Sequence, residues 1–204
     1  MKLKFCGIRR PEDISYVNAA PPDYIGFVFA ESRRQVTAAK ARALSDSLYP
    51  GIQTVGVFVN EPLPRLLEIA AVAGLCVLQL HGDEDEGYIR MVRARWSGPI
   101  WKAVRVQTAE DIERAQQLSV DALLLDAFSP DAYGGTGKPA DFELIAQNRP
   151  TLPFFLAGGL NVTNLRDAIR IVKPDGIDLS GGIETNGCKD AAKIQEIYDL
   201  VRGV

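Results

Sequence analysis

Hydrophobic residues recur along the chain in short, nearly continuous runs that have the length of β-strands. They occupy residues 2–8 (KLKFCGI), 24–29 (YIGFVF), 54–59 (TVGVFV), 77–82 (VLQLHG), 99–104 (PIWKAV), 122–128 (ALLLDAF), 154–160 (FFLAGGL) and 176–183 (GIDLSGGI). Runs that lack strict alternation of apolar and polar positions are typical of strands buried on both faces, as in parallel sheets. The runs begin about 22 to 32 residues apart, which fits one strand followed by one helix.

The segments between these runs carry helix signals. Pro11, followed by two acidic residues, suits the first turn of a helix. Thr37 and Asn60 each precede a helical pattern and are predicted to cap it. Thr108, with an aspartate three residues later, resembles a capping box. A last amphipathic helix is predicted over residues 189–201.

Eight strand–helix units predict a single-domain (β/α)8 barrel over residues 1–204. This length supports one well-filled core, and no Ser/Gly-rich linker divides the series. Eight units in so short a chain favour a closed barrel over an open doubly wound sheet. The open sheet stays an alternative, because periodicity alone does not establish closure.

Composition narrows the function classes. The net charge is −3 and no basic stretch interleaves with aromatic residues, which argues against nucleic-acid binding. All apolar runs are far shorter than a membrane span, and no cleavable signal is apparent. Cys6, Cys76 and Cys188 show neither disulfide nor metal-ligand spacing, and His81 is the only histidine. We therefore expect a cytoplasmic protein without a metal site.

Residues with chemical potential cluster where the predicted strands end, which is where barrel enzymes place their active sites. Gly158 and Gly159 end the seventh strand, and Ser180, Gly181 and Gly182 end the eighth. Glycine lets backbone amides approach an anion closely, so the two ends together predict a phosphate site. Tight turns without a ligand are the alternative.

Three further side chains have both a functional and a structural interpretation. Asp126 is either a structural acceptor or a functional acid, and Cys6 is either a small buried hydrophobe or, near positive charge, a base. Arg33 or Arg34, after the second strand, could pair with a carboxylate or phosphate, although loop arginines are often merely solvated. The glycine-rich loop 133–142 suits closure over a ligand but lacks P-loop spacing.

Eight motifs in order across almost the whole chain closely resemble phosphoribosylanthranilate isomerase of tryptophan biosynthesis. They are KFCGIRRPED, GFVFAESRRQV, VGVFVNE, LQLHGDE, LLLDAF, YGGTGKPADF, FFLAGGLNVTN and IDLSGGIET. The resemblance implies a cofactor-free (β/α)8 enzyme that converts N-(5-phosphoribosyl)anthranilate to 1-(2-carboxyphenylamino)-1-deoxyribulose 5-phosphate by an Amadori rearrangement. An association with indole-glycerol-phosphate synthase is a further expectation.

The resemblance also implies residue roles. Cys6 matches the family's general base and Asp126 its general acid. Arg34, with Arg33 as alternate, matches the arginine that binds the anthranilate carboxylate. The glycine-rich ends, Gly158, Gly159, Ser180, Gly181 and Gly182, match the phosphate site. His81 falls in the family's QLHG motif; we expect it to line the pocket or to fix neighbouring groups, with a structural histidine as the plain alternative.

The chain departs from the family pattern in three places. Arg9 stands where a small polar residue is common and is expected to add charge near the mouth of the barrel. Gly181 replaces the second serine of the strand-eight motif, which removes a hydroxyl donor to phosphate and keeps the backbone amides. The loop 133–142 lacks the usual aromatic residue before its aspartate.

Three rival functions are weaker. A metal-dependent pentose-phosphate epimerase needs more histidines than this chain has. The related histidine-pathway isomerase uses paired aspartates, whereas the first strand here offers Cys6. A non-catalytic sugar-phosphate binder could keep the glycine ends and lose Cys6 or Asp126, but both are present.

Overall fold

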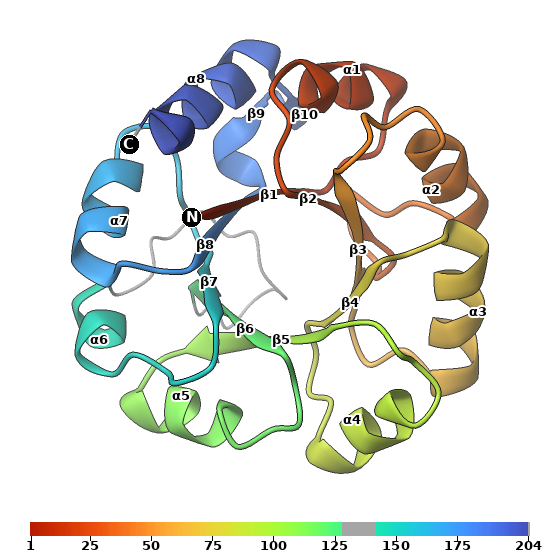
Figure 1. Cartoon of the computed structure of the whole chain (residues 1–204), viewed down its shortest axis with the longest axis vertical. Coiled ribbons are helices and arrows are strands. Elements are labelled where there is room, and N and C mark those ends of the chain that lie inside the picture. Colours follow the sequence, from red (N-terminus) through yellow and green to blue (C-terminus); the bar gives the residue numbers. More distant parts are fainter. Residues whose placement is uncertain (128–141, 204) are drawn as a thin grey trace.

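The computed structural model describes residues 1–127 and 142–203, and its centre is a closed barrel of eight parallel strands in sequence order (Figure 1). The strands are β1 (Lys2–Cys6), β2 (Tyr24–Val28), β3 (Gln53–Phe58), β4 (Val77–Leu80), β5 (Ile100–Val106), β6 (Ala122–Ala127), β7 (Phe154–Leu156) and β8 (Gly176–Leu179). Closure comes from pairing between β1 and β8. The prediction of a closed barrel is confirmed over the open-sheet alternative.

Eight α-helices surround the barrel within the described residues (Figure 1). They are α1 (Pro11–Ala19), α2 (Ala38–Ser45), α3 (Leu63–Ala73), α4 (Glu86–Arg93), α5 (Ala109–Ala115), α6 (Phe142–Gln147), α7 (Leu165–Val172) and α8 (Ala191–Arg202). Between β8 and α8 lie a short 3-10 helix, η1 (Gly181–Ile183), and a hairpin of β9 (Glu184–Thr185) and β10 (Cys188–Lys189). None of the described helices combines the length and apolar character needed to cross a membrane.

Successive side chains of each strand point alternately outward, toward the helices, and inward, into the barrel. Outward residues such as Leu3 and Phe5 of β1 join the large core between barrel and helices. Inward residues form a smaller core in the barrel, in which Tyr24, Trp101 and Phe155 pack ring against ring. The ring centroids of Trp101 and Phe155 are 4.5 Å apart. These bulky rings fill the part of the barrel interior nearest the N-terminal ends of the strands. Polar side chains that point inward therefore lie nearer the C-terminal ends of the strands.

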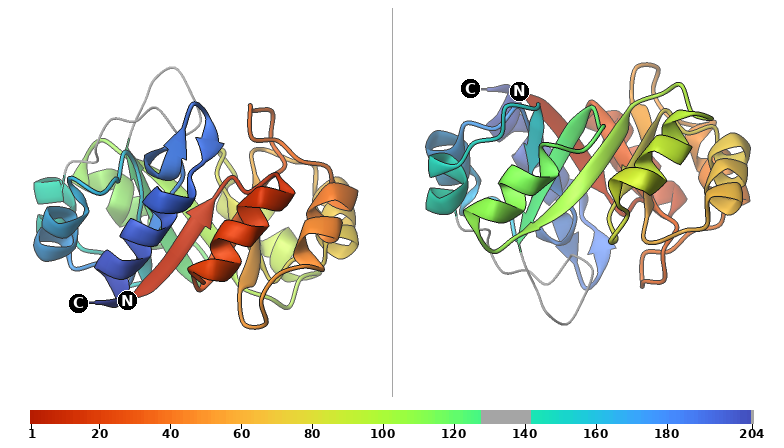
Figure 2. Two further views of the ribbon diagram at one scale, coloured as in Figure 1. Left: turned by 90° about the horizontal axis from the view of Figure 1, so that it is seen from above. Right: turned by 90° about the horizontal axis from the view of Figure 1, so that it is seen from below.

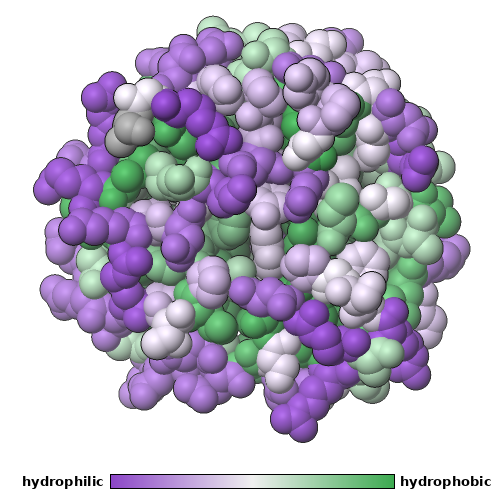
Figure 3. Space-filling model, in the orientation of Figure 1, coloured by the Kyte–Doolittle hydropathy of each residue, from purple (hydrophilic) through white to green (hydrophobic). Residues whose placement is uncertain are grey.

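The two ends of the barrel differ. Figure 2 (left) shows the strands running from the end that carries the N-terminus to the opposite end, where the β9–β10 hairpin lies. Figure 3 shows the face that Figure 1 turns to the viewer, which is the end with the N-terminus. Hydrophilic side chains dominate the periphery of this face, and hydrophobic ones show between them. The carboxyl ends of the strands point away from the N-terminal end and form the mouth.

Most predicted helix starts are confirmed, and one is wrong. The Thr37 side chain accepts a hydrogen bond from the Lys40 amide at 3.2 Å, and the Thr108 amide donates to Asp111 at 2.9 Å. Asn60 does not cap α3, which begins at Leu63. Asn60 instead adopts a left-handed backbone conformation (φ 52°), and its backbone amide donates to Glu84 of the loop after β4.

The aromatic packing inside the barrel gives a stability prediction. Phe155→Ala removes a ring that is only 5 % exposed, so we expect the free energy of unfolding in urea to fall by about 3–5 kcal/mol. The control is Met91→Ala on α4, which is 49 % exposed and should change that free energy by less than about 0.5 kcal/mol. Equal effects of the two substitutions would contradict the account of the barrel interior.

Candidate active site

A cavity of about 1160 Å³ opens at the mouth of the barrel. Every predicted site residue lines it, although they come from six different strand ends. These residues are Cys6, Arg34, His81, Asp126, Gly158, Gly159, Ser180, Gly181 and Gly182, and the alternate Arg33 lines it too. The fold therefore brings the whole predicted set to one site.

Cys6, the last residue of β1, lines this cavity and is 8 % exposed. Lys4 and Asp178 are buried beside it, and Lys4 Nζ donates to Asp178 Oδ1 at 3.0 Å. Burial raises the pKa of the Cys6 thiol above its usual value, while the cationic Lys4 and Lys189 partly oppose the rise. The thiol is thus buried but faces positive charge.

Asp126, near the end of β6, lies beside His81, which directly follows β4. His81 Nε2 is 3.4 Å from Asp126 Oδ2, and both side chains are buried. On the other side of the ring, His81 Nδ1 is 2.9 Å from the amide nitrogen of Gln79. With that amide as donor, Nδ1 is the acceptor and Nε2 carries the hydrogen; within the described residues this N–H makes no hydrogen bond, although it lies near Asp126. His81 thus lines the cavity next to Asp126, and its role stays a prediction.

The Arg34 guanidinium is held by a carboxylate from the β9 strand. Arg34 Nε and Nη2 donate to the two oxygens of Glu184 at 2.7 and 2.9 Å, and Arg33 Nη2 donates to the same group at 2.9 Å. Lys189 Nζ is 2.9 Å from Glu184 Oε1. Burial alone would raise the pKa of Glu184, but Arg34 and Lys189 lower it to about 2. The carboxylate stays ionised and fixes the arginine at the cavity wall.

This pairing leaves part of the arginine available. Nη1 of Arg34 donates to no acceptor within residues 1–127 and 142–203, and a guanidinium has five N–H donors. The edge turned away from Glu184 can therefore meet a second planar anion.

The glycine-rich ends of β7 and β8 form another wall. Gly158 and Gly159 have φ values of 88° and 65°, which other residues rarely adopt. In the described part of the chain, no acceptor takes the amide hydrogens of these two residues. A side chain at Gly182 would collide with the carbonyl of Leu160, so glycine is needed there for close packing. The Ser180 hydroxyl donates to the Cys6 carbonyl at 3.1 Å, which fastens β8 to β1.

Two expectations about the rim need comment. Arg9 Nη2 donates to the Gly187 carbonyl at 3.0 Å and so fastens the turn of the β9–β10 hairpin, which lies at the mouth end of the barrel. Arg9 is not among the described residues that line the cavity. The loop 133–142, expected to close over a ligand, lies outside the described residues apart from Phe142.

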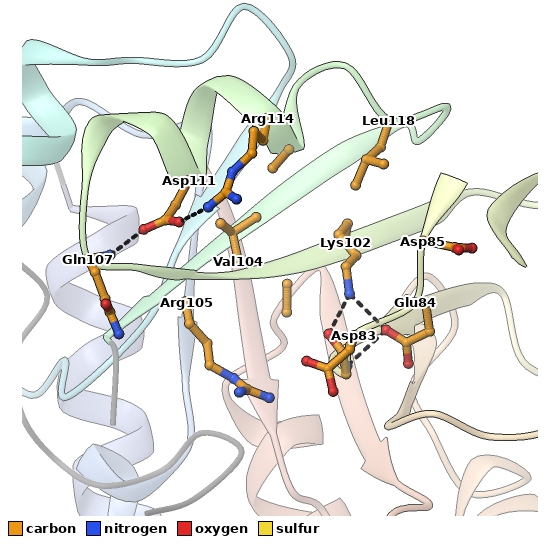
Figure 4. A pocket seen from close by; sticks show the side chains of 13 residues that line it. Asp83, Glu84, Asp85, Lys102, Val104, Arg105, Gln107, Asp111, Arg114 and Leu118 are labelled. Carbon is orange, nitrogen blue, oxygen red and sulfur yellow. Dashed lines mark hydrogen bonds and ion pairs between the residues drawn. The ribbon is translucent and has the colours of Figure 1, made fainter. Parts of the chain in front are cut away.

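A second hollow, of about 600 Å³, lies between α5 and the loop after β4 (Figure 4). Two pairs of its charged groups bind each other. Lys102 Nζ donates to the Gly82 carbonyl and to Glu84, both at 2.7 Å, and Arg114 Nη2 pairs with Asp111 at 2.6 Å. Because Glu84 also accepts from the Gly82 amide, this cluster holds the turn that follows His81. We assign it a structural role.

Sequence reasoning missed several polar residues of the site: Lys4, Gln79, Asp178, Glu184 and Lys189. The signal for three of them was present. Lys4, Gln79 and Asp178 each lie on a strand, two positions before a predicted site residue at or just past the end of that strand, and strand side chains two apart share a face. Within the described residues, no group of three His, Cys, Asp or Glu side chains is arranged to hold a metal.

Comparison with known proteins identifies the family to which this sequence is similar. Residues 3–199 match the family described as N-(5'phosphoribosyl)anthranilate (PRA) isomerase. The chain is 44% identical over 204 residues to N-(5'-phosphoribosyl)anthranilate isomerase of Thermoanaerobacter sp. (strain X514), covering 100% of this chain and 99% of the relative.

Solved structures agree with the sequence match. Phosphoribosyl anthranilate isomerase from Thermotoga maritima superposes with a TM-score of 0.89 at 34% identity, with both chains covered completely. A phosphoribosyl anthranilate isomerase in complex with reduced 1-(o-carboxyphenylamino)-1-deoxyribulose 5-phosphate superposes with a TM-score of 0.86, also at 34% identity and with both chains covered completely.

The ionised Glu184 gives a prediction about acid sensitivity. Its pKa is about 2 in the folded protein against 4.5 for an ordinary glutamate, so its stabilising contribution is complete above about pH 4.5 and is lost as the pH falls toward 2. Because water screens part of the cluster, we expect a contribution of about 1–2 kcal/mol. Glu184→Gln should therefore lower stability near neutral pH, and its deficit against wild type should shrink in acid.

Urea unfolding of both proteins across this pH range measures the deficit. Glu196→Gln, at an exposed position of α8, is the matched control and should follow the wild type throughout. A deficit that stays constant from neutral to acid pH would show that the Glu184 carboxylate does not carry the effect.

Proposed function

The chain belongs to the N-(5'-phosphoribosyl)anthranilate isomerase family, and we propose that Cys6 and Asp126 are the acid–base pair of its reaction. The protein is an isomerase of tryptophan biosynthesis that converts N-(5-phosphoribosyl)anthranilate to 1-(2-carboxyphenylamino)-1-deoxyribulose 5-phosphate. The observation that supports the pair is their convergence: Cys6 of β1 and Asp126 of β6 line one cavity together with an arginine and two glycine-rich strand ends.

Asp126 acts first, as general acid. In its protonated form it donates a proton to the ring oxygen of the ribose, and the bond between that oxygen and C1′ breaks. The nitrogen lone pair forms the C1′=N bond, which gives a protonated Schiff base. The position of Asp126 supports this role, because its buried carboxyl group lines the cavity that would hold the substrate.

Cys6 acts second, as general base. The cationic C1′=N group makes the C2′ proton acidic, and the thiolate removes it. The electrons of the C2′–H bond form an enolamine, which tautomerises to the ketone. Acid and base are thus supplied from different sides of the cavity, and the net change is a rearrangement within one molecule.

The two anionic ends of the substrate have matching groups. We assign the phosphate to the backbone amides of Gly158, Gly159, Gly181 and Gly182, because glycine gives an anion close access to N–H groups. The Ser180 hydroxyl is engaged by the Cys6 carbonyl, so it contributes by shaping the loop. We assign the anthranilate carboxylate to the edge of Arg34 that Glu184 leaves open. A relative has been solved in complex with reduced 1-(o-carboxyphenylamino)-1-deoxyribulose 5-phosphate, a ligand that carries both anionic groups.

The proposal extends to the setting of the enzyme. Residues 1–204 form one barrel domain that works in the cytoplasm on a small phosphorylated substrate. The three free cysteines support a reducing compartment. Association with indole-glycerol-phosphate synthase is part of the proposal, and co-purification of the two proteins at natural abundance tests it.

Substitution of the two residues tests the acid–base pair. We expect Cys6→Ala and Asp126→Asn each to lower kcat at least about 100-fold, since each removes one proton transfer. Turnover is followed through the fluorescence of the anthranilate group, with excess chelator present. Cys188→Ala, at a half-buried position outside the cavity lining, is the control and should keep normal activity.

The pH profile adds a check that needs no substitution. Because burial raises the pKa of Cys6, kcat/KM should increase from neutral to alkaline pH as the thiolate forms. If activity survives Cys6→Ala, Cys6 is a buried structural residue and not the general base. If activity survives Asp126→Asn, a different group must be the general acid.

Gly181 provides a test of the phosphate site. A Cβ at this position would have Arg34 Nη2 as its nearest neighbour at 3.8 Å, so a serine fits without displacing the chain. We expect Gly181→Ser to lower KM several-fold with little change in kcat, because the hydroxyl adds a donor to a group that does not react. Gly181→Ala is the matched control and should leave KM unchanged. Equal KM values for the serine and alanine variants would place the phosphate elsewhere.

A further inference from the structure

A buried lysine lies directly below the proposed base and has no part in the reaction as derived above. Lys4 is 0 % exposed and precedes Cys6 by two positions on β1, so both side chains point into the barrel. Lysine is almost never fully buried unless it is paired. Its partner is Asp178, which lies opposite it in the β1–β8 register and accepts from Nζ at 3.0 Å.

The side chains of Lys4 and Cys6 both lie against a glycine of the neighbouring strand β2. Gly26 of β2 pairs with Cys6 in the β1–β2 register. A Cβ built on Gly26 would lie 2.7 Å from Cys6 Sγ and 3.2 Å from Lys4 Nζ. The sulfur and the ammonium group therefore face each other across the space that this glycine leaves open, and any larger residue would push into both.

Four charged groups face the Cys6 sulfur, and they come from several elements. Lys4 lies on β1, Asp178 on β8, Lys189 on β10, and Arg34 follows β2. Two of the cations are already committed to another carboxylate, because Lys189 and Arg34 both bind Glu184. Among the charges, Lys4 has the largest effect on the thiol, larger than the opposing effect of Asp178.

We propose that Lys4 is a positioning residue for the general base: its ammonium group stabilises the Cys6 thiolate, and Asp178 holds the ammonium in place. This inference rests on the proposed role of Cys6. An ammonium has three N–H donors, so one can bind Asp178 while another points at the sulfur. Before proton abstraction the cluster holds a thiolate, an ammonium and a carboxylate. Afterwards Cys6 is a neutral thiol and the Lys4–Asp178 pair is unchanged.

The test measures the thiol directly. In protein that carries Cys76→Ser and Cys188→Ser, Cys6 is the only cysteine, and its thiolate is followed by ultraviolet absorbance against pH, with Cys6→Ala protein subtracted. We expect Lys4→Met to raise the midpoint of the thiol titration by at least about one pH unit, because the thiolate loses the ammonium group that faces it across Gly26. Lys40→Met, at an exposed position of α2, is the matched control and should leave the midpoint unchanged.

The activity of the same proteins connects the midpoint to catalysis. We expect the alkaline rise in kcat/KM to move by the same interval as the thiol midpoint, with KM nearly unchanged. An unmoved midpoint in folded Lys4→Met protein overturns the proposal. A midpoint that moves while the kcat/KM profile stays in place overturns the role of Cys6 as base, and with it the catalytic role of Lys4.

A further variant covers the case in which Lys4→Met does not fold because Asp178 is left unpaired. The double variant Lys4→Met, Asp178→Asn removes both buried charges together. Its midpoint should still lie above that of the parent, because the attraction of Lys4 exceeds the repulsion of Asp178. A midpoint at or below that of the parent overturns the proposal.

Discussion

Closure of the barrel by the β1–β8 pairing is the constraint from which the site follows. The register sets Lys4 opposite Asp178 and brings the first and last strands of the barrel together. Because the strands of a closed barrel are staggered around it, the inward side chains of alternate strands form layers. The aromatic rings of the inner core fill the lower part, which leaves the inward positions nearest the mouth for polar groups. A different register would separate Cys6 from its charged neighbours.

Inside the mouth, buried charges are tolerated because they are paired. Lys4 with Asp178, and Arg34 with Glu184, each combine a short contact with burial of both partners. Removing one member of such a pair leaves the other charge without compensation, which costs far more than the pair itself contributes. The pairs therefore fix geometry more than they add stability, and fixed geometry is what proton transfer between defined atoms requires.

The strands and most helix starts could be predicted from the sequence because local pattern and capping chemistry agree with the fold. Cys6, Asp126 and the glycine ends could be predicted too, since they occupy strand ends. The bidentate contact between Arg34 and Glu184 could not, because it joins residues 150 positions apart through the β9–β10 hairpin. The prediction that Asn60 caps the next helix was wrong for a similar reason. Its backbone amide donates to Glu84 from the loop after β4, and no local sequence pattern reveals that contact.

The placement of charge at the mouth, and not its total, decides what the site can receive. Lys4, Lys189, Arg33 and Arg34 outnumber the two carboxylates that bind them, Asp178 and Glu184. Glu31, Glu61 and Asp126 also line the cavity, so the described residues around it carry no positive excess as a whole. A ligand with a phosphate at one end and a carboxylate at the other therefore depends on local donors, which are the glycine amides and the open edge of Arg34 to which we assign its two ends. The cations beside Cys6 act in the same local way, because Lys4 opposes the rise in the pKa of the thiol that burial causes.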